Sequence, residues 1–529
     1  MKLDPPDPPE AKTFSKDDVA SIVIGYQEKI HYLEERIRLL QNELFGRKSE
    51  KRYPDDHRQM PIFEQPAAEA DKGETPKTIV VAEHQRIRGR KPLPDNLPRV
   101  EVIHDIPEDQ KICACGARLS RIGQDKCEKL DYVPAKVRVL RHIRYKYACK
   151  SCEGVEDDGP TVKIAPPPVA LIPKSNVTEG LLAHIVVSKF VDGLPLYRQE
   201  KIFARMGIEL PRATMANWTI HAAQCCSPML DLLQTDLRSG PLINMDETPM
   251  QVLKEPGRAD TTKSYMWVFC GGAPEHPTVL YRYYPTRSGE TALKFLDDYQ
   301  GYIQSDDYNG YDYMGNKQGI VQLGCWAHVR RKFFDVVKVR KKQRGHRDNP
   351  KGLADQAIDF IGELYLIEKQ IRAEQLTPSQ ICQRRQERSN PVLDKFKTWL
   401  DTTYPLTPPK GLLGMAIGYA LKNWQKLVLY TTDGLLRPDN NVAENAIRPF
   451  VIGRKNWLFA GHPNGAHAAA TFYSLIETAK ANGLEPYGYL CCLFERLPFV
   501  KDQSGYHALM PQYIDRNLIR PSALNESRA

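Results

Sequence analysis

The stretch GPLINMDETPM, residues 240–250, decides the fold prediction because it sets two adjacent acids directly after a short apolar run. Leu242 and Ile243 have the character of a buried strand, and Asp246 and Glu247 follow where that strand is expected to end. A single acid at a strand end most often belongs to a solvated turn after an edge strand. A catalytic role for Asp246 therefore requires further acids that the fold brings beside it.

The residues that follow predict the order strand, strand, strand, helix, strand. The predicted elements are two β-rich runs at 264–272 and 278–287, a helix at 290–299, and a short strand in GYIQSDDYNGYD, residues 301–312. This is the order of an RNase H-like domain, in which the first strand lies at the sheet centre beside the fourth. Asp246 and Asp306, 306 − 246 = 60 residues apart in the chain, should then be neighbours in space.

Two carboxylates at adjacent strand ends repel each other unless a cation lies between them. Mg²⁺ (or Mn²⁺) is the expected cation, because it prefers oxygen ligands and leaves positions for a phosphate oxygen. A two-metal phosphoryl transfer normally asks for one more carboxylate. We expect that third acid to lie downstream on a helix.

Glu444 is the candidate for the third acid. Asp439, Asn440 or Asn441 is a suitable helix N-cap, which places Glu444 in the first turn, and Pro449 should end or bend the helix. A lone Glu in a first turn is usually only favourable to the helix dipole. The basic and aromatic residues that follow favour a DNA contact instead. They are Arg448, Arg454, Lys455 and Trp457.

Two close cysteine pairs predict a zinc finger with structural Zn²⁺, because such pairs beside small residues suit a tetrahedral thiolate site. The expected ligands are Cys113, Cys115, Cys149 and Cys152. Cys127, between the pairs, is expected to be a plain thiol. The basic strand-like run KVRVLRHIRYKY, residues 136–147, could face DNA.

Residues 18–46 carry apolar side chains at heptad spacing, which predicts a coiled coil and self-association; an amphipathic helix packed on its own domain is the alternative. Residues 47–98 have the composition of a flexible linker. Its tract RIRGRKPLP contains Arg88, Arg90 and Lys91 and resembles an AT-hook that inserts Arg into the minor groove, although a solvated basic linker has the same composition.

Residues 175–225 have the helix lengths of a helix-turn-helix, with helices at 197–206 and 212–221. The residues expected to be exposed on the second helix for groove contact are Arg212, Thr214, Asn217 and Thr219. A purely structural three-helix module is the alternative.

Composition adds broad limits. The chain has 529 residues, 41% of them hydrophobic, which is enough for several domains. No run approaches the roughly 18 apolar residues of a spanning helix, and the start lacks a signal peptide's apolar core, so a soluble intracellular protein without a membrane partner is expected. The 12 Cys do not suggest a disulfide framework, and a formal charge of +9 leans mildly toward a polyanionic partner.

Together these motifs resemble a bacterial transposase of the insertion sequence 66 family. The resemblance rests on NMDET, QSDDYNGYD, GCWAHVRRKFFD and NNVAENAIRPFVIGRKNWLFAG, with the cysteine-rich finger and the N-terminal coiled coil. It implies an Asp-Asp-Glu triad at Asp246, Asp306 and Glu444, and binding to double-stranded DNA at the terminal inverted repeats of its own element and at the target. It also implies accessory proteins encoded by the same element and a cytoplasmic, nucleoid-associated location. Asp307 stands where relatives commonly have Gly.

GCWAHVRRKF resembles a Cys-x-x-His signature found after the second Asp in several transposase groups. Cys325 and His328 would need two further ligands to hold zinc, and none lies nearby in the sequence, so His328 is interpreted as a polar or phosphate contact. Arg330 and Arg331, one turn on, are expected to contact DNA as well.

The predicted class is thus multidomain α+β. Its parts are the coiled coil at 18–46, the linker at 47–98, the finger at 99–165, the helix-turn-helix-like module at 175–225, the RNase H-like core at 240–337 and 431–485, a helical insertion at 338–430 and a C-terminal segment at 486–529. Two other functions fit the same motifs: a non-catalytic DNA-binding regulator derived from a transposase, and an RNase H-like nuclease without strand transfer.

Overall fold

The computed structural model describes residues 162–288, 294–306, 317–344 and 351–519, with residues 137–148, two strands before residue 88 and six helical residues near the N-terminus. It divides into two compact units, Pro66–Pro168 and the rest of the chain. Within these described ranges no helix is both long and apolar enough to cross a bilayer. Every cysteine they contain is a free thiol.

The unit Pro66–Pro168 contains two short antiparallel pairs. The strands are β1 (Thr78–Val81) with β2 (His84–Ile87), and β3 (Lys146–Ala148) with β4 (Val162–Ile164). The sequence predicted one strand over residues 136–147. This prediction is wrong for residues 137–145, which have no regular structure. Their side chains are exposed, Val139 among them, so no packing holds them in a ladder.

The N-terminal helix is described at Tyr26, Ile30, Leu33, Glu34, Arg36 and Ile37. The four apolar residues of this set, which belong to the predicted heptad seam, are exposed. The helical conformation is therefore confirmed at these positions. Pairing with a second copy stays a prediction.

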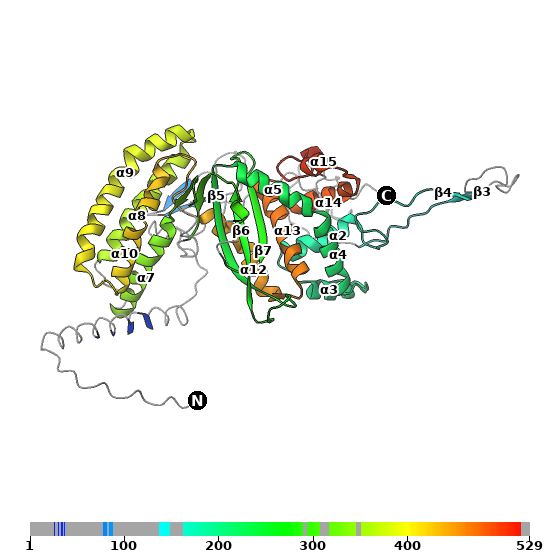
Figure 1. Cartoon of the computed structure of the whole chain (residues 1–529), viewed down its shortest axis with the longest axis horizontal. Coiled ribbons are helices and arrows are strands. Elements are labelled where there is room, and N and C mark those ends of the chain that lie inside the picture. The colour runs from blue at the N-terminus through cyan, green and yellow to red at the C-terminus, as the bar shows by residue number, and fades with distance from the viewer. Residues whose placement is uncertain are drawn as a thin grey trace, which may run out of the picture. The chain divides into compact units, whose positions relative to one another are not determined.

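A mixed sheet forms the centre of the larger unit (Figure 1). Its strands are β5 (Leu242–Val252), β6 (Lys263–Gly271), β7 (Thr278–Tyr284), β8 (Gly301–Gln304) and β9 (Ile320–Leu323). They lie in the order β7-β6-β5-β8-β9, and β10 (Phe459–Ala460) pairs with the far end of β5. The expected order is confirmed, because β5 is central and runs parallel to β8.

Helices cover this sheet and share one hydrophobic core with it. They are α2 (Glu179–Phe190), α3 (Leu196–Arg205), α4 (Arg212–Cys225), α5 (Ser227–Ser239), α12 (Asn441–Trp457), α13 (Pro463–Ala481), α14 (Pro486–Arg496) and α15 (Gln503–Ala508), with 3₁₀ turns η6 (Leu497–Phe499) and η7 (Arg516–Leu518). α3 and α4 confirm the two helices predicted for the helix-turn-helix, and Gly207 supplies the left-handed turn between them at φ 77°. These helices belong to the same compact unit as the sheet.

α13 packs along β7, at the edge of the sheet (Figure 1). The β7 amide of Tyr281 donates to Ser474 Oγ at 2.7 Å, and that of Val279 donates to Thr478 Oγ1 at 3.0 Å. Hydroxyls of the helix thus satisfy backbone groups that an edge strand would otherwise expose.

The segment between β9 and α12 is helical, as predicted, and has a second core. Its elements are α7 (Trp326–Arg344), α8 (Leu353–Ala373), α9 (Pro378–Thr403), α10 (Leu412–Lys422) and α11 (Trp424–Val428), with η4 (Tyr404–Leu406) and η5 (Leu429–Thr431). Figure 1 shows α7–α10 gathered as a separate group of helices beside the sheet. The chain leaves this insertion through residues 432–440 and enters α12.

Candidate active site

Asp246 and Asp306 lie beside each other on the sheet. The parallel ladder between β5 and β8 ends with Asn244 opposite Gln304. Asp246 and Asp306 each follow their member of this pair by two residues, Asp246 within β5 and Asp306 just beyond the end of β8. β5 does not end at Asp246, as the sequence suggested. It continues to Val252 because its other edge stays paired with β6, where Asp246 faces Val268.

The electrostatics of Asp246 reflect a crowded acidic site. Burial and, to a smaller extent, the nearby carboxylates of Glu247, Asp306 and Glu444 together raise the pKa of Asp246 to about 8. The backbone amide of Glu247 donates to Asp246 Oδ1 at 2.8 Å. This hydrogen bond lowers the pKa of Asp246 but offsets only part of the increase. Such a group is ionised at neutral pH only when a cation compensates it.

Glu444 reaches the same site from the first turn of α12. Burial raises its pKa, the guanidinium of Arg331 lowers it, and Asp306 is one of the acids that raise it. α12 continues through Pro449 to Trp457, so the prediction that the helix ends at this proline is wrong, whereas the alternative of a bend there stays a prediction. One missing helix hydrogen bond is tolerated here because the helix packs on the sheet core.

A buried amide network holds the start of α12 against the two acid-bearing strands. Asn244 Nδ2 donates to Gln304 Oε1 at 2.9 Å and to Asn440 Oδ1 at 3.0 Å, and Asn440 Nδ2 donates to the Met245 carbonyl at 2.9 Å. Asn440 is the N-cap, as predicted, but its side chain makes these contacts instead of capping the helix. The network therefore sets the position of Glu444 relative to Asp246.

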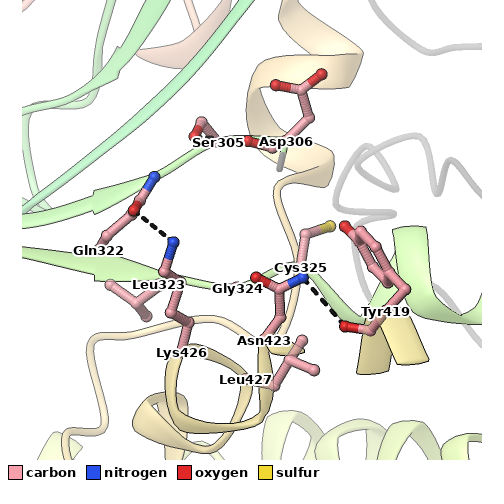
Figure 2. Close-up of a pocket in the computed structure, with 10 residues that line it drawn as sticks. All are labelled: Ser305, Asp306, Gln322, Leu323, Gly324, Cys325, Tyr419, Asn423, Lys426 and Leu427. Atoms are coloured by element: carbon pink, nitrogen blue, oxygen red, sulfur yellow. Dashed lines mark hydrogen bonds between the residues drawn. The ribbon is translucent and has the colours of Figure 1, made fainter. Parts of the chain in front are cut away.

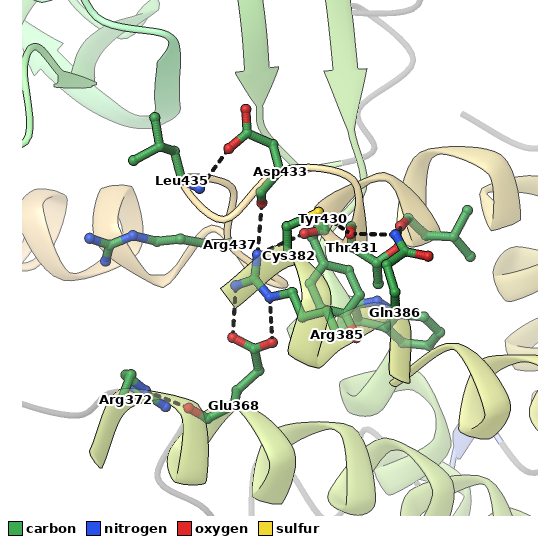
Figure 3. Close-up of polar contacts among 12 residues, drawn as sticks. Glu368, Arg372, Cys382, Arg385, Gln386, Tyr430, Thr431, Asp433, Leu435 and Arg437 are labelled. Carbon is green, nitrogen blue, oxygen red and sulfur yellow. Dashed lines mark hydrogen bonds and ion pairs between the residues drawn. The ribbon is translucent and has the colours of Figure 1, made fainter. Parts of the chain in front are cut away.

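The loop before α12 is held from the other side by the insertion. Arg385 of α9 is buried, pairs with Glu368 of α8 at 2.8 Å, and donates to the carbonyls of Tyr430 and Asp433, each at 2.8 Å. Figure 3 shows this guanidinium between the carboxylate and the loop. Gln386 adds a bond to the Thr431 carbonyl at 2.8 Å. α9 thus fixes the carbonyls of the segment that leads to Glu444.

Two residues of α7 face Glu444. His328 Nε2 lies 3.7 Å from Glu444 Oε1, and Arg331 Nη2 lies 3.5 Å from Glu444 Oε2. Burial lowers the pKa of His328 to about 4, with smaller effects from Arg331 and Lys332, so the imidazole is neutral at pH 7. Cys325, just before the helix, places its Sγ near the same group. The expectation that no further ligand lies near Cys325 and His328 is therefore wrong, because the fold brings Glu444 to them.

Arg287 connects Glu247 with Asp306. Its guanidinium bonds the Glu247 carboxylate, which is almost fully buried, and lies 3.8 Å from Asp306 Oδ2. Sequence reasoning assigned no role to Arg287, because it follows β7 in an irregular segment. Strand alternation along β5 by itself predicts only that Glu247 points away from Asp246.

A small pocket adjoins the acids. Figure 2 shows it between Asp306, Cys325 and the start of α11, with Lys426 Nζ bonded to Gln322 Oε1 at 2.8 Å. The pocket gives Asp306 and Cys325 a common hollow at the end of β8 and β9.

The predicted DNA-contacting residues are in different environments. Arg212 and Asn217 of α4 are exposed, whereas Thr219 is only 4% exposed and donates to the Met215 carbonyl at 2.7 Å, so its expected exposure is wrong. The helix turns Thr219 into the core, one turn after Met215. Arg330 and Arg331 lie on α7.

The cluster at the end of α12 is partly engaged within the protein. Arg454 Nη1 donates to Thr248 Oγ1 of β5 at 3.0 Å, and Lys455 is exposed. Lys189 Nζ lies 4.4 Å from the centre of the Trp457 ring, which also packs edge-on against Phe190. Base stacking by Trp457 stays a prediction, as do phosphate contacts by Arg448 and its neighbours.

Several predicted residues lie outside the described ranges. They are Arg88, Arg90, Lys91, the four finger cysteines Cys113, Cys115, Cys149 and Cys152, and Asp307.

Known protein families match most of the chain. The model described as Transposase IS66 family matches residues 174–468, the zinc-finger binding domain of transposase IS66 matches 110–153, the model described as Transposase C of IS166 homeodomain matches 32–102, and the IS66 C-terminal element matches 474–512.

Two relatives come from Sinorhizobium fredii (strain NBRC 101917 / NGR234). The uncharacterized protein y4jD is 36% identical over 433 residues, which are 78% of this chain and 81% of that protein. The uncharacterized protein y4hP is 30% identical over 489 residues, 88% of this chain and 85% of that protein. Since the first family model covers more than half of the chain and contains all three acids of the site, the protein belongs to the IS66 family of transposases.

Proposed function

We propose that this protein is a DNA transposase that cleaves the ends of its mobile element and joins them to target DNA, with Asp246, Asp306 and Glu444 as the catalytic acids of an RNase H-like core. The observation that carries the proposal is the arrangement of these acids. Asp246 lies on β5, Asp306 follows the end of the adjacent parallel strand β8, and the Asn440–Asn244 hydrogen bond brings the helix of Glu444 to them.

The donor set fits Mg²⁺ or Mn²⁺. The three acids offer carboxylate oxygens only, and Asp246 lies in a buried position where a negative charge is costly without a cation. Bound there, the metal would activate the attacking oxygen and stabilise the leaving one. The protein's own contribution is to keep the three carboxylates fixed through β5, β8 and α12.

Residues around the acids are suited to a phosphodiester. Arg331 lies beside Glu444 on the exposed face of α7, and Arg330 precedes it. Exposed guanidinium groups next to carboxylates can hold a phosphate oxygen while the acids hold metal. His328, neutral at pH 7, would contribute a polar contact and no charge.

DNA recognition would use the segments before the core. The zinc finger would hold structural Zn²⁺ through Cys113, Cys115, Cys149 and Cys152, and the exposed Arg212 and Asn217 would contact a groove. The N-terminal helix would join two copies, and accessory proteins of the same element would complete the complex. Such a protein works at the nucleoid in the bacterial cytoplasm.

A strand-transfer assay tests the proposal. A pre-cut 3′-end oligonucleotide carrying the element's terminal repeat is incubated with the full chain, plasmid and Mg²⁺. Joining supports the transposase, cutting without joining indicates a nuclease, and binding alone indicates a DNA-binding regulator. Asp246→Asn, Asp306→Asn and Glu444→Gln should each abolish joining and keep end binding, because phosphate contacts by Lys and Arg supply most of the affinity.

A further inference from the structure

Cys325, His328 and Glu444 form a cluster that the proposed chemistry does not use as a set. One ligand atom of each lies within 4.8 Å of the others. Cys325 and His328 stand at the start of α7, and Glu444 stands in the first turn of α12. The thiol and the imidazole therefore approach Glu444 on the α7 side, whereas Asp246 and Asp306 lie on the sheet.

Two atoms of this cluster are buried without a hydrogen bond. Glu444 Oε1 accepts none, although its side chain is only 10% exposed, and His328 Nδ1 has none either. The 3.7 Å between Glu444 Oε1 and His328 Nε2 is too long for such a bond. Buried polar atoms left in this state are costly, and a cation bound to Glu444 Oε1 would satisfy the carboxylate.

The donor types select the cation. Thiolate, imidazole and carboxylate together are ligands of Zn²⁺, whereas Mg²⁺ prefers oxygen alone. Zinc bonds of about 2.0–2.3 Å bring tetrahedral ligands to roughly 3.5 Å from one another. The observed separation of His328 and Glu444 is already near that value, and the Cys325 sulfur lies within 4.8 Å of both.

A backbone amide is available to the Cys325 sulfur. The Asn440 amide donates to Cys325 Sγ at 3.3 Å, which is the kind of contact that orients a metal-bound sulfur. Cys325 also lines the pocket that it shares with Asp306 (Figure 2). Three protein ligands leave the fourth zinc position for water.

We propose that Cys325, His328 and Glu444 form a binding site for a zinc-class divalent cation, and that this cation competes with Mg²⁺ for Glu444. Zinc at this site holds the Glu444 carboxylate toward α7, away from the metal bound by Asp246 and Asp306. Excess zinc therefore inhibits the reaction. The inhibition depends on the proposed function, whereas the binding site does not.

Zinc content measures the site directly. The full chain is dialysed against buffered micromolar ZnCl₂, and bound zinc is determined for the wild type, Cys325→Ser and His328→Gln. The finger contributes equally to all three, so the wild type should hold roughly one equivalent more than either variant. Cys226→Ser is the control, because Cys226 is equally buried but lies at the junction of α4 and α5. Equal zinc content in all four proteins would overturn the site.

Loss of zinc binding can be distinguished from unfolding of a variant. Serine retains an oxygen that can accept the Asn440 amide, and thermal melts show whether Cys325→Ser remains folded. Should Cys325→Ser unfold, the zinc content of His328→Gln still tests the site, because the His328 side chain is only partly buried.

Joining assays test the competition. Each protein is compared with its own zinc-free rate at fixed Mg²⁺ while ZnCl₂ is raised. The wild type should lose activity at lower zinc than His328→Gln, and more Mg²⁺ should restore it. Identical inhibition curves would overturn the competition. Absence of joining in the zinc-free wild type would instead refute the proposed function, with the zinc content still valid.

Discussion

Asn244 and Asn440, 196 residues apart in the chain, share a side-chain hydrogen bond of 3.0 Å. Asn440→Ala should therefore lower the joining rate far more than DNA-end binding, because Glu444 loses its fixed position. Unfolding should also become easier by about 1–3 kcal/mol, since buried partners are left unsatisfied. Denaturant unfolding and joining rates measure the two effects.

Asn482→Ala is the matched control for Asn440→Ala. Like Asn440, Asn482 makes two side-chain hydrogen bonds: its Nδ2 donates to the carbonyls of Pro277 and Thr478, each at 2.8 Å. Asn482, however, lies at the end of α13. It should cost similar stability and leave joining nearly intact. Equal loss of joining in both variants would contradict a positioning role for Asn440.

Asp246 should make the magnesium-free protein less stable as pH rises. The pKa of Asp246 is raised from 3.8 to about 8, so between these values the folded chain holds a proton that the unfolded chain has lost. Stability then falls with rising pH through this window. In magnesium-free buffer, we expect the melting temperature of Asp246→Asn minus that of the wild type to become larger as the pH is raised from about 5 to about 8. A pH-independent difference would contradict the perturbed carboxyl.

Glu247→Gln should raise the Mg²⁺ concentration needed for joining. Neutralising Glu247 weakens its pairing with Arg287, which then interacts more strongly with Asp306 and competes with the metal. The half-saturating Mg²⁺ concentration should increase, and high Mg²⁺ should recover the rate. Arg287→Met combined with Glu247→Gln should remove the added Mg²⁺ requirement, and its persistence in the double variant would refute this explanation.

Variants of the buried Arg385–Glu368 pair should show whether Arg385 affects joining independently of stability. Arg385→Met alone leaves Glu368 buried without its partner and should destabilise the chain by about 3–5 kcal/mol. Glu368→Leu with Arg385→Met should recover much of that stability. Joining should stay low in the double variant, since the carbonyls of Tyr430 and Asp433 have lost their donor. Full recovery of joining would show that Arg385 acts only through stability.

Asn217 and Thr219 of α4 should respond differently to alanine. Asn217→Ala should weaken binding to the element end with little change in melting temperature, because the side chain is exposed. Thr219→Ala should lower the melting temperature and spare binding, because Thr219 is buried. Fluorescence anisotropy with terminal-repeat DNA measures the first effect. Unchanged binding of Asn217→Ala would exclude this face of α4 from the DNA interface.

Much of the sheet could be predicted from local pattern. Alternating apolar runs and turn residues indicated the strand order, and that order placed Asp246 beside Asp306. The length of β5 could not be predicted this way, because its continuation past Asp246 depends on pairing with β6. Pro449 was misleading for a similar reason, since core packing of α12 outweighs one lost hydrogen bond.

The contacts that complete the site had weaker signals in the sequence. The polar residues Asn244 and Gln304 sit at inward positions of otherwise apolar strands, which was an available hint of a buried network. Arg287 and Arg385 had none, because each acts on groups distant in the chain. Such pairings depend on tertiary geometry, which residue spacing does not encode.

The side-chain hydrogen bond between Asn244 and Asn440 also bears on the order in which the protein is made. During synthesis strands β5–β9 leave the ribosome first, and the insertion, with a core of its own, can fold next. Its folding brings the start of α7 near the start of α12, where Trp326 N donates to the Pro438 carbonyl at 3.0 Å, and so shortens the loop that α12 must close. A nascent chain that ends before residue 444 lacks the third acid of the proposed site, so under the proposed function it cannot yet cut the DNA beside which it is translated.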